Sequence, residues 1–164
     1  MKKVLRLSEA AATDVARQVF AKDMAASIDE CVRGVTGLKG MFIRNSYKLV
    51  KSVRPGYIEH ILFVMSDDFI HAYEPLHDRY REGLMLPAEK IPPFGDYLAR
   101  HKDEAYEAFI GVSDRYAASR AGSVIEKAYT AFRSQIRQEF PLALPYMARV
   151  IEKHTLVDAD NKAE

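Results

Sequence analysis

The sequence has little of what marks an extracellular or membrane-spanning protein. It contains one cysteine, Cys31, and no tryptophan among 164 residues. An intrachain disulfide is therefore excluded, and a reducing compartment fits. The longest run of large apolar residues, 61–65, is far too short to span a bilayer, and no apolar segment follows the N-terminal lysines as it would in a signal peptide. We therefore expect a cytoplasmic protein without a transmembrane segment.

Recognisable catalytic and cofactor motifs are missing as well. The chain has no GxGxxG, GxxxxGK[ST], HExxH, GxSxG or CxxC. Cys31 stands beside Glu30 and near Asp29, which disfavour a reactive thiolate. The net charge of +1 also gives no global field to attract nucleic acid or a membrane. We expect no cofactor and favour a protein that is not an enzyme, although the sequence alone leaves that question open.

What the chain does have is helical periodicity almost throughout, with weak signals for strands and hairpins. We expect an all-α single-domain bundle of six or seven helices over residues 1–156, and a polar, disordered tail over 157–164. Pro75 is expected to kink or split a helix near Tyr73, and Pro141 is expected to end a long helix that starts at Ser123. A Pro-rich loop is predicted near residues 83–93, between two halves of the bundle.

A glycine-rich, basic segment covers residues 34–56. Gly34 is expected to cap the end of the preceding helix, and Gly40 to allow a close backbone approach. Residues 38–53 predict an amphipathic helix. The stripe expected to face the core falls within roughly 40° of one direction at about 100° per residue, and it consists of Leu38, Phe42, Leu49 and Val53.

Charge is segregated between this segment and the next one. Residues 31–58 contain six Lys or Arg and no acid, whereas residues 59–82 contain six acids and two arginines. The favoured interpretation is that the two faces neutralise each other or are solvated separately. The alternative is that the basic helix 38–54 binds an anion, a nucleic acid or an anionic surface. The residues that would then carry the binding are Arg44, Lys48, Lys51 and Arg54.

A second polar pattern has the residue types of a metal site. Carboxylates and a histidine recur at i, i+4, i+7 and i+11, which places them on one stripe of a helix; they are Asp67, His71, Glu74 and Asp78. That stripe lies roughly opposite the apolar stripe of the same helix, whereas a bundle metal site needs ligands that face the interior. We interpret it as a solvated face and expect no metal, with these four residues kept as the alternative.

The aromatic residues and the remaining histidines carry no motif. The tyrosines and phenylalanines lie mostly at helical spacing, which predicts core packing. A pocket for an apolar ligand, or a dimer interface, is the alternative for some of them. His60, His77, His101 and His154 are expected at the surface or half-buried.

Several short stretches resemble an uncharacterised all-helical bacterial family of unknown function, over residues 25–150 or so. They are the sequences GLKG at 37–40, YKLVK at 47–51, PGY at 55–57 and FGDYL at 94–98, together with the region around Tyr129. The resemblance implies a helical, bacterial and cytoplasmic protein, and it provides no catalytic residues.

These observations define one leading functional hypothesis and two alternatives. The leading hypothesis is a non-enzymatic helical protein that binds a partner, with self-association into a homo-oligomer included. The first alternative is anion or nucleic-acid binding through the basic helix. The second is an apolar small-ligand carrier, or a helical enzyme, with an aromatic pocket.

Overall fold

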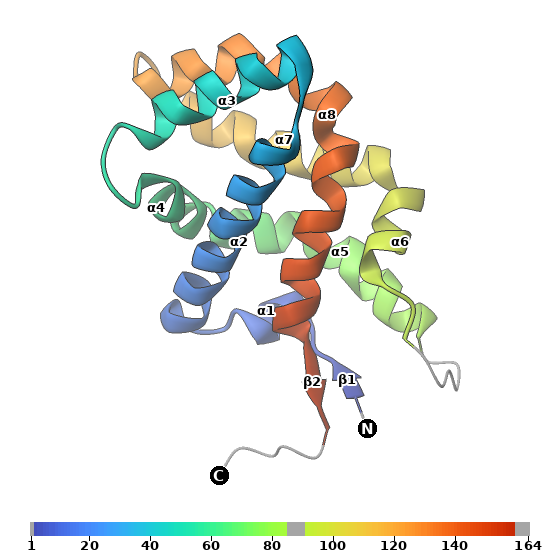
Figure 1. Ribbon diagram of the computed structural model, residues 1–164. Helices are drawn as coiled ribbons and strands as arrows, with labels where there is room; N and C mark the ends of the chain where they lie inside the picture. The colour runs from blue at the N-terminus through green and yellow to red at the C-terminus, as the bar shows by residue number, and fades with distance from the viewer. Residues whose placement is uncertain (1, 85–90, 160–164) are drawn as a thin grey trace.

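Helices account for nearly all regular structure in the computed structural model, which describes residues 2–84 and 91–159 (Figure 1). They are α1 (Leu7–Ala10), α2 (Asp14–Gly34), α3 (Gly37–Lys51), α4 (Tyr57–Val64), α5 (Ser66–Gly83), α6 (Phe94–Arg100), α7 (Lys102–Ala118) and α8 (Val124–Thr155). The predicted all-α class is confirmed, with more helices in the described residues than the six or seven expected.

A short antiparallel sheet joins the two ends of the described chain. Strand β1 (Lys2–Val4) pairs with β2 (Leu156–Asp158), with Lys3 opposite Val157. The tail expected over 157–164 therefore begins inside a strand, and its residues 160–164 lie outside the described part of the chain. Most of the predicted 83–93 loop, residues 85–90, lies outside it too, while residues 91–93 have no regular structure.

Local capping explains where the two longest helices begin. The Thr13 side chain accepts a 3.1 Å hydrogen bond from the Ala16 amide at the start of α2. The Ser123 hydroxyl accepts in the same way from the Glu126 amide at the start of α8, 3.2 Å away. The predicted start at Ser123 is therefore confirmed.

The internal prolines do not interrupt their helices, so the split expected near Tyr73 and the helix end expected at Pro141 are wrong. The chain breaks at Met65, between α4 and α5, rather than near Tyr73, and α5 continues through Pro75. Likewise α8 continues through Pro141 and Pro145. A proline removes one backbone hydrogen bond, but both helices are fixed by core residues on either side of their prolines, including Tyr73 and Leu76 in α5 and Phe140, Leu144 and Met147 in α8.

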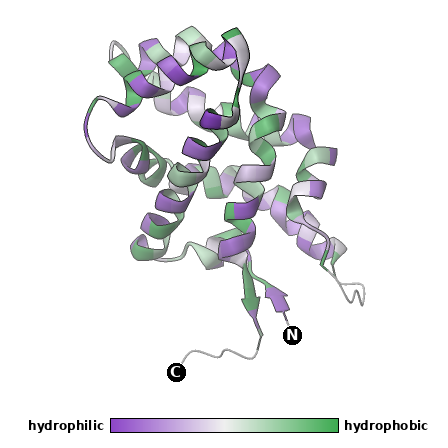
Figure 2. Cartoon of the chain, in the orientation of Figure 1, coloured by the Kyte–Doolittle hydropathy of each residue, from purple (hydrophilic) through white to green (hydrophobic). Residues whose placement is uncertain are grey.

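The well-packed core lies between α1, α5, α6, α7 and the C-terminal half of α8, with Phe20 and Met24 of α2 at its edge. Phe94, Leu98 and Ile151 are completely shielded from solvent at its centre. Figure 2 shows that the longer helices carry both hydrophobic and hydrophilic residues, as amphipathic helices around a core do. No helix among the described residues is long and apolar enough to cross a bilayer.

The half of the molecule around α3 and α4 is packed much less tightly. Gly40 is the one buried residue of α3, and α4 has none. The predicted core stripe of α3 is wrong in its direction: Leu38 is 81% exposed and Leu49 50% exposed, and Phe42 and Val53 are exposed as well. The side of α3 that faces the protein is a different one, and it borders a cavity.

Two glycine predictions in this region also had different outcomes. Gly34 is the last residue of α2, and its successor Val35, at φ −78°, forms the C-cap, so the predicted glycine cap is wrong. Gly40 does allow a close approach, because a Cβ there would lie 2.5 Å from the Val35 carbonyl oxygen. This glycine lets the first turn of α3 pack directly against the connection from α2.

Candidate functional site

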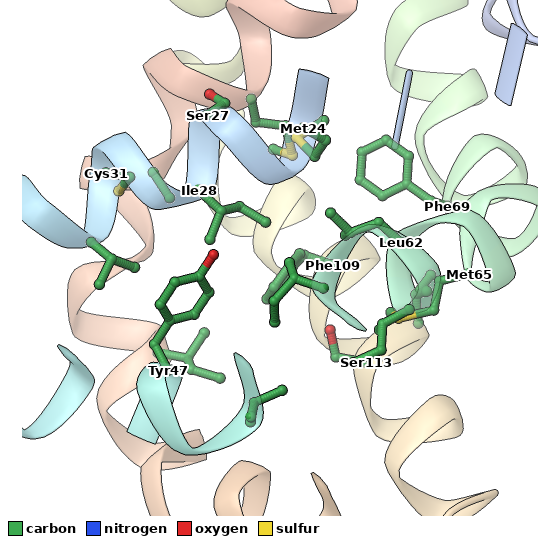
Figure 3. Close-up of a pocket in the computed structure, with 18 of the residues that line it drawn as sticks. Met24, Ser27, Ile28, Cys31, Tyr47, Leu62, Met65, Phe69, Phe109 and Ser113 are labelled. Atoms are coloured by element: carbon green, nitrogen blue, oxygen red, sulfur yellow. The ribbon is translucent and has the colours of Figure 1, made fainter. Parts of the chain in front are cut away.

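An apolar cavity of about 360 Å³ lies between α2, α3, α4, α7 and α8, with the first turn of α5 at its edge (Figure 3). Its walls consist almost entirely of aliphatic, aromatic and methionine side chains. The residues that point into it in Figure 3 include Met24, Ile28, Tyr47, Leu62, Phe69 and Phe109. Well-packed protein interiors hold few voids larger than a water molecule, so a space of this size needs an explanation.

Each wall follows from helical spacing in the sequence. On α2 the lining residues Phe20, Met24 and Ile28 recur every four positions. On α7 the lining residues Phe109, Val112, Ser113, Tyr116 and Ala117 occupy positions i, i+3, i+4, i+7 and i+8. The aromatic residues that the periodicity assigned to the core are therefore divided between the packed core and the cavity wall.

Helix α3 provides one wall of the cavity and packs against α8, α2 and α4. Its inner side consists of Ile43, Tyr47 and Val50. The Tyr47 hydroxyl donates a 2.6 Å hydrogen bond to the Asp29 carboxylate on α2. The Lys51 ammonium group lies 3.0 Å from the same carboxylate. Asp29 thus holds α3 against α2 through two polar contacts.

These contacts change the acidity of both groups. Burial alone would raise the pKa of Asp29, but the hydrogen bonds from Tyr47 and Lys51 bring the pKa below its ordinary value. Burial raises the pKa of Tyr47 well above its ordinary value, and the hydrogen bond to Asp29 raises it further. At neutral pH the pair is therefore a neutral phenol that donates to a carboxylate.

A second tyrosine of the cavity wall is bound in the same way. Tyr129 of α8 lines the cavity, and its hydroxyl donates a 2.6 Å hydrogen bond to Asp114. Arg133 also contacts this carboxylate, at 2.7 Å. In both cases the ring faces the cavity while the hydroxyl is bound to a carboxylate. The tyrosines therefore present carbon rather than oxygen to whatever enters.

Most of the other polar atoms in the wall are also occupied. The Ser27 hydroxyl donates to the Tyr146 carbonyl at 3.1 Å, and the Ser66 hydroxyl to the Phe63 carbonyl at 2.6 Å. Burial raises the pKa of the Cys31 thiol, so this side chain is neutral and unreactive at neutral pH. These atoms contribute little polarity to the cavity.

Ser113 on α7 is the exception. Its side chain is 8% exposed and directed into the cavity (Figure 3), and its hydroxyl has no hydrogen-bond partner within residues 2–84 and 91–159. One helical turn further on, the Tyr116 hydroxyl is buried without a partner in the same described ranges. The cavity thus has one small polar region on α7, and the half-buried carboxylate side chain of Glu139 also lines it from α8.

The four residues of the predicted anion site have different neighbours. Lys51 pairs with Asp29, and the Arg44 guanidinium donates to the Val35 carbonyl. Arg54 lies over the ring of Tyr57, with its guanidinium carbon 5.2 Å from the ring centre. Lys48 is exposed on the outer side of the helix. Two of the four thus serve to fix α3 in place.

The acidic stripe of α5 binds cations near the N-terminus rather than the basic helix. Glu74 and Asp78 contact the Arg6 guanidinium at 3.3 and 2.8 Å. Asp67 lies 3.5 Å from Arg17, and the ring of His71 bonds the Asp67 backbone carbonyl. No group of three or more His, Cys, Asp or Glu in the described residues is placed to hold a metal ion.

Sequence reasoning missed a buried histidine. His77 is completely shielded from solvent, against the rings of Tyr80 and Phe94, where a surface or half-buried position was expected. Neither of its ring nitrogens has a hydrogen-bond partner among the described residues. Burial lowers the pKa of His77 to about 4, with a further contribution from Arg81. Because His77 belongs to a helix rich in charged residues, its place in the sequence did not indicate that it would be buried.

The fold and the cavity define an all-helical protein with a ligand-sized apolar interior. The chain belongs to a family of unknown function (DUF6918), which it matches over residues 7–155. The resemblance to an uncharacterised family, inferred from short stretches of the sequence, is thereby confirmed. No curated protein and no solved structure matches the chain significantly.

Proposed function

We propose that this protein is a binding protein that holds a small apolar molecule in the cavity between α2, α3, α4, α7 and α8. The observation that carries the proposal has two parts. The cavity has a volume of about 360 Å³, and two of the helices around it, α3 and α4, bury almost none of their own side chains. Small-molecule sites in proteins typically enclose roughly 300–1,000 Å³ and are lined mainly by apolar and aromatic groups.

Energetics support an occupied cavity. Enclosed empty volume in a protein core costs about 24 cal/mol per Å³; this space is partly open to solvent, so only its enclosed part carries that cost. The whole free energy of unfolding of a typical domain is only roughly 5–15 kcal/mol. Water would not fill the space well, since buried water needs two to four polar partners and the wall offers few. An apolar guest would recover most of the lost contacts.

The wall also indicates the chemistry of the guest. Tyr47 and Tyr129 turn their hydroxyls toward carboxylates and their rings toward the cavity. The ligand is therefore expected to be a hydrocarbon-like molecule. The free hydroxyl of Ser113 would accept or donate one hydrogen bond, so a single hydroxyl, carbonyl or ester group on the ligand fits.

The proposal joins two of the hypotheses from the sequence, a non-enzymatic binding protein and an apolar-ligand carrier. A bacterial source and a cytoplasmic location stay predictions, and so does self-association. Light scattering on the purified protein tests self-association directly, because a monomer at high concentration would contradict it.

Binding of a neutral fluorescent probe, N-phenyl-1-naphthylamine, tests the proposed function. We expect saturable binding with a stoichiometry of about one, displaced by straight-chain alcohols. Ala143 lines the cavity on α8, so the variant Ala143→Phe should fill the space and reduce binding. The adjacent Leu142 is 54% exposed and does not line the cavity, so Leu142→Phe is the matched control and should bind normally. Equal binding by both variants would contradict the proposal.

A further inference from the structure

The outer side of α3 is an exposed apolar strip. The large apolar side chains on it are Leu38, Met41, Phe42, Leu49 and, just after the helix, Val53, between 40% and 81% exposed. They make up half of the large, exposed apolar residues found in the described part of the chain. A cluster of this kind on a single short helix marks an interaction surface rather than ordinary surface composition.

Cations border the strip and acids are absent from it. At about 100° per residue, Lys48 lies on one side of the Leu38–Leu49 direction and Lys39 on the other. Lys39 contacts a neutral group, Gln138 of α8, at 2.7 Å. No Asp or Glu occurs from residue 31 to residue 58. The outer face of α3 is therefore mainly apolar along its centre, where Asn45 is also exposed, and positive along its edges.

We propose that this face of α3 docks on an anionic lipid surface. An amphipathic helix that lies in a membrane interface combines an apolar stripe with flanking Lys or Arg, and binds through both buried area and attraction to anionic lipid. A basic residue near such a surface contributes about 1 kcal/mol. Lys39 and Lys48 at the edges of the strip, and Arg54 just after the helix, have no acidic partner among the described residues.

The distribution of charge on this face favours an anionic lipid surface over two other partners, a second copy of the chain and a nucleic acid. A second copy of the chain, bound through the same face by a twofold axis, would place lysines opposite lysines. A nucleic acid would satisfy the cations, but it would leave Leu38 and Leu49 without an apolar partner. A lipid interface satisfies the apolar strip and the cations together.

The docking face and the cavity wall are formed by two different sides of the same helix, α3. Ile43, Tyr47 and Val50 on the inner side of α3 line the cavity, whereas Phe42 and Leu49 on the outer side are exposed. Docking of α3 would therefore place the proposed cavity next to the membrane interface. The inference goes beyond the proposed function and does not depend on it, because it rests on the outer side of the helix alone.

Co-sedimentation with lipid vesicles tests the inference. We expect the full chain to bind vesicles of phosphatidylcholine with phosphatidylglycerol, to bind pure phosphatidylcholine weakly, and to lose binding as salt increases. The double variant Phe42→Ser/Leu49→Ser should lower the partition coefficient roughly tenfold or more. Val15 and Val19 on α2 are similarly exposed, at 70% and 47%, so Val15→Ser/Val19→Ser is the matched control and should bind like the parent protein.

Charge reversal gives an independent readout. Lys48→Glu should weaken binding to the anionic vesicles at low salt and have little effect on the neutral ones. Circular dichroism and probe binding in the cavity show that each variant is folded. These measurements also separate the two proposals, since a protein that binds vesicles but not the probe retains the docking face and loses only the cavity ligand.

Three results would overturn the docking proposal. One is a parent protein that does not bind anionic vesicles even at low ionic strength. Another is a dimer, seen by light scattering, that becomes monomeric in Phe42→Ser/Leu49→Ser, because a second copy would then cover the strip. The third is displacement of the protein from vesicles by single-stranded or duplex nucleic acid at comparable charge concentration.

Discussion

Tyr47 and Asp29 join helices α3 and α2 at the wall of the cavity. The hydroxyl of Tyr47 on α3 lies 2.6 Å from the carboxylate of Asp29 on α2, and Lys51 binds the same carboxylate at 3.0 Å. The ring of the same tyrosine lines the cavity. This pair therefore couples the position of α3 to the closure of the proposed ligand site.

Removing this carboxylate should loosen α3. We expect Asp29→Ala to lower the free energy of unfolding by about 1–3 kcal/mol, because the half-buried Tyr47 hydroxyl loses its acceptor. We also expect the probe to leave the cavity faster, which stopped-flow fluorescence measures. Glu107→Ala removes an exposed acid 3.9 Å from Arg137 and is the control, with little effect expected on either quantity. An unchanged dissociation rate in Asp29→Ala would show that α3 does not control access.

Filling the cavity should stabilise the free protein. Ala143 borders the space, so Ala143→Leu buries new methyl groups without displacing neighbours, and the free energy of unfolding should rise by about 1–2 kcal/mol. Ala148 is 1% exposed, does not line the cavity and lies 3.5 Å from the Cβ position of Gly95. Ala148→Leu should therefore destabilise the protein by about 1–3 kcal/mol through overpacking. Urea denaturation without ligand measures both, and destabilisation by Ala143→Leu would mean that the space is already filled by protein.

Two glycines inside helices should respond oppositely to alanine. A Cβ at Gly40 would lie 2.5 Å from the Val35 carbonyl oxygen, whereas one at Gly111 would meet only the flexible end of Arg115, at 3.6 Å. Gly40→Ala should lower the melting temperature, with a cost of about 1–3 kcal/mol. Gly111→Ala should raise it, by up to about 1 kcal/mol, through higher helix propensity. Thermal unfolding followed by circular dichroism separates the two, and similar shifts in both would contradict the close approach at Gly40.

The charge of His77 should make stability depend on pH in a defined window. Its pKa is about 4 in the folded protein and ordinarily about 6.5, so the unfolded chain binds the proton more readily. Stability from this residue is complete above pH 6.5 and is lost as the pH falls toward 4, by about 3 kcal/mol in all. Arg81 opposes the protonated ring, while Asp78 and Glu74 favour it, less strongly than burial opposes it.

The variant His77→Leu isolates this effect. Its two ring nitrogens lack partners among the described residues, so an apolar replacement of similar size should raise stability at neutral pH by about 1–3 kcal/mol. The slope between pH 6.5 and 4 should become shallower in urea titrations at a series of pH values. A destabilised variant with an unchanged slope would show that His77 is bonded in solution to a group outside the described residues.

The fold class could be predicted from the sequence, because helical periodicity and capping residues are local signals. The starts of α2 and α8 depend on Thr13 and Ser123, each of which binds an amide three residues away. The predictions at the prolines were wrong because the hydrogen bond that a proline removes can be read from the local sequence. The core packing that compensates for this loss cannot. The turns of α8 on either side of Pro141 pack in the core against residues that are distant in the sequence.

The cavity could be predicted only in outline. Periodicity correctly placed Phe109 and Tyr129 on inward faces, but the same pattern describes a packed core and a hollow one. In α3 it selected Leu38, Phe42 and Leu49 as the inner face, although Ile43, Tyr47 and Val50 face the protein. Both sides of α3 carry apolar residues. Helical periodicity in the sequence does not indicate which of two apolar sides packs against the rest of the chain.

The contact between Tyr47 and Asp29 was beyond sequence reasoning for a different reason. The two residues are 18 positions apart on separate helices, and each would be unremarkable on a solvated face. Segregated charge suggested that the basic helix and the acidic residues 59–82 would neutralise each other or be solvated separately, but Lys51 pairs with Asp29 on α2. Pairing between helices depends on their packing, which a single sequence does not encode locally.

The most direct test of the account is a measurement of nuclear Overhauser effects between the neutral naphthylamine probe and the methyl groups of the protein. The account predicts contacts from the bound probe to methyls of the cavity wall, such as those of Ile28, Leu62 and Met147. It also predicts the loss of these contacts in Ala143→Phe. Contacts confined to Leu38 and Leu49 on the outer side of α3, or no contacts at all, would contradict the claim that the cavity is the ligand site.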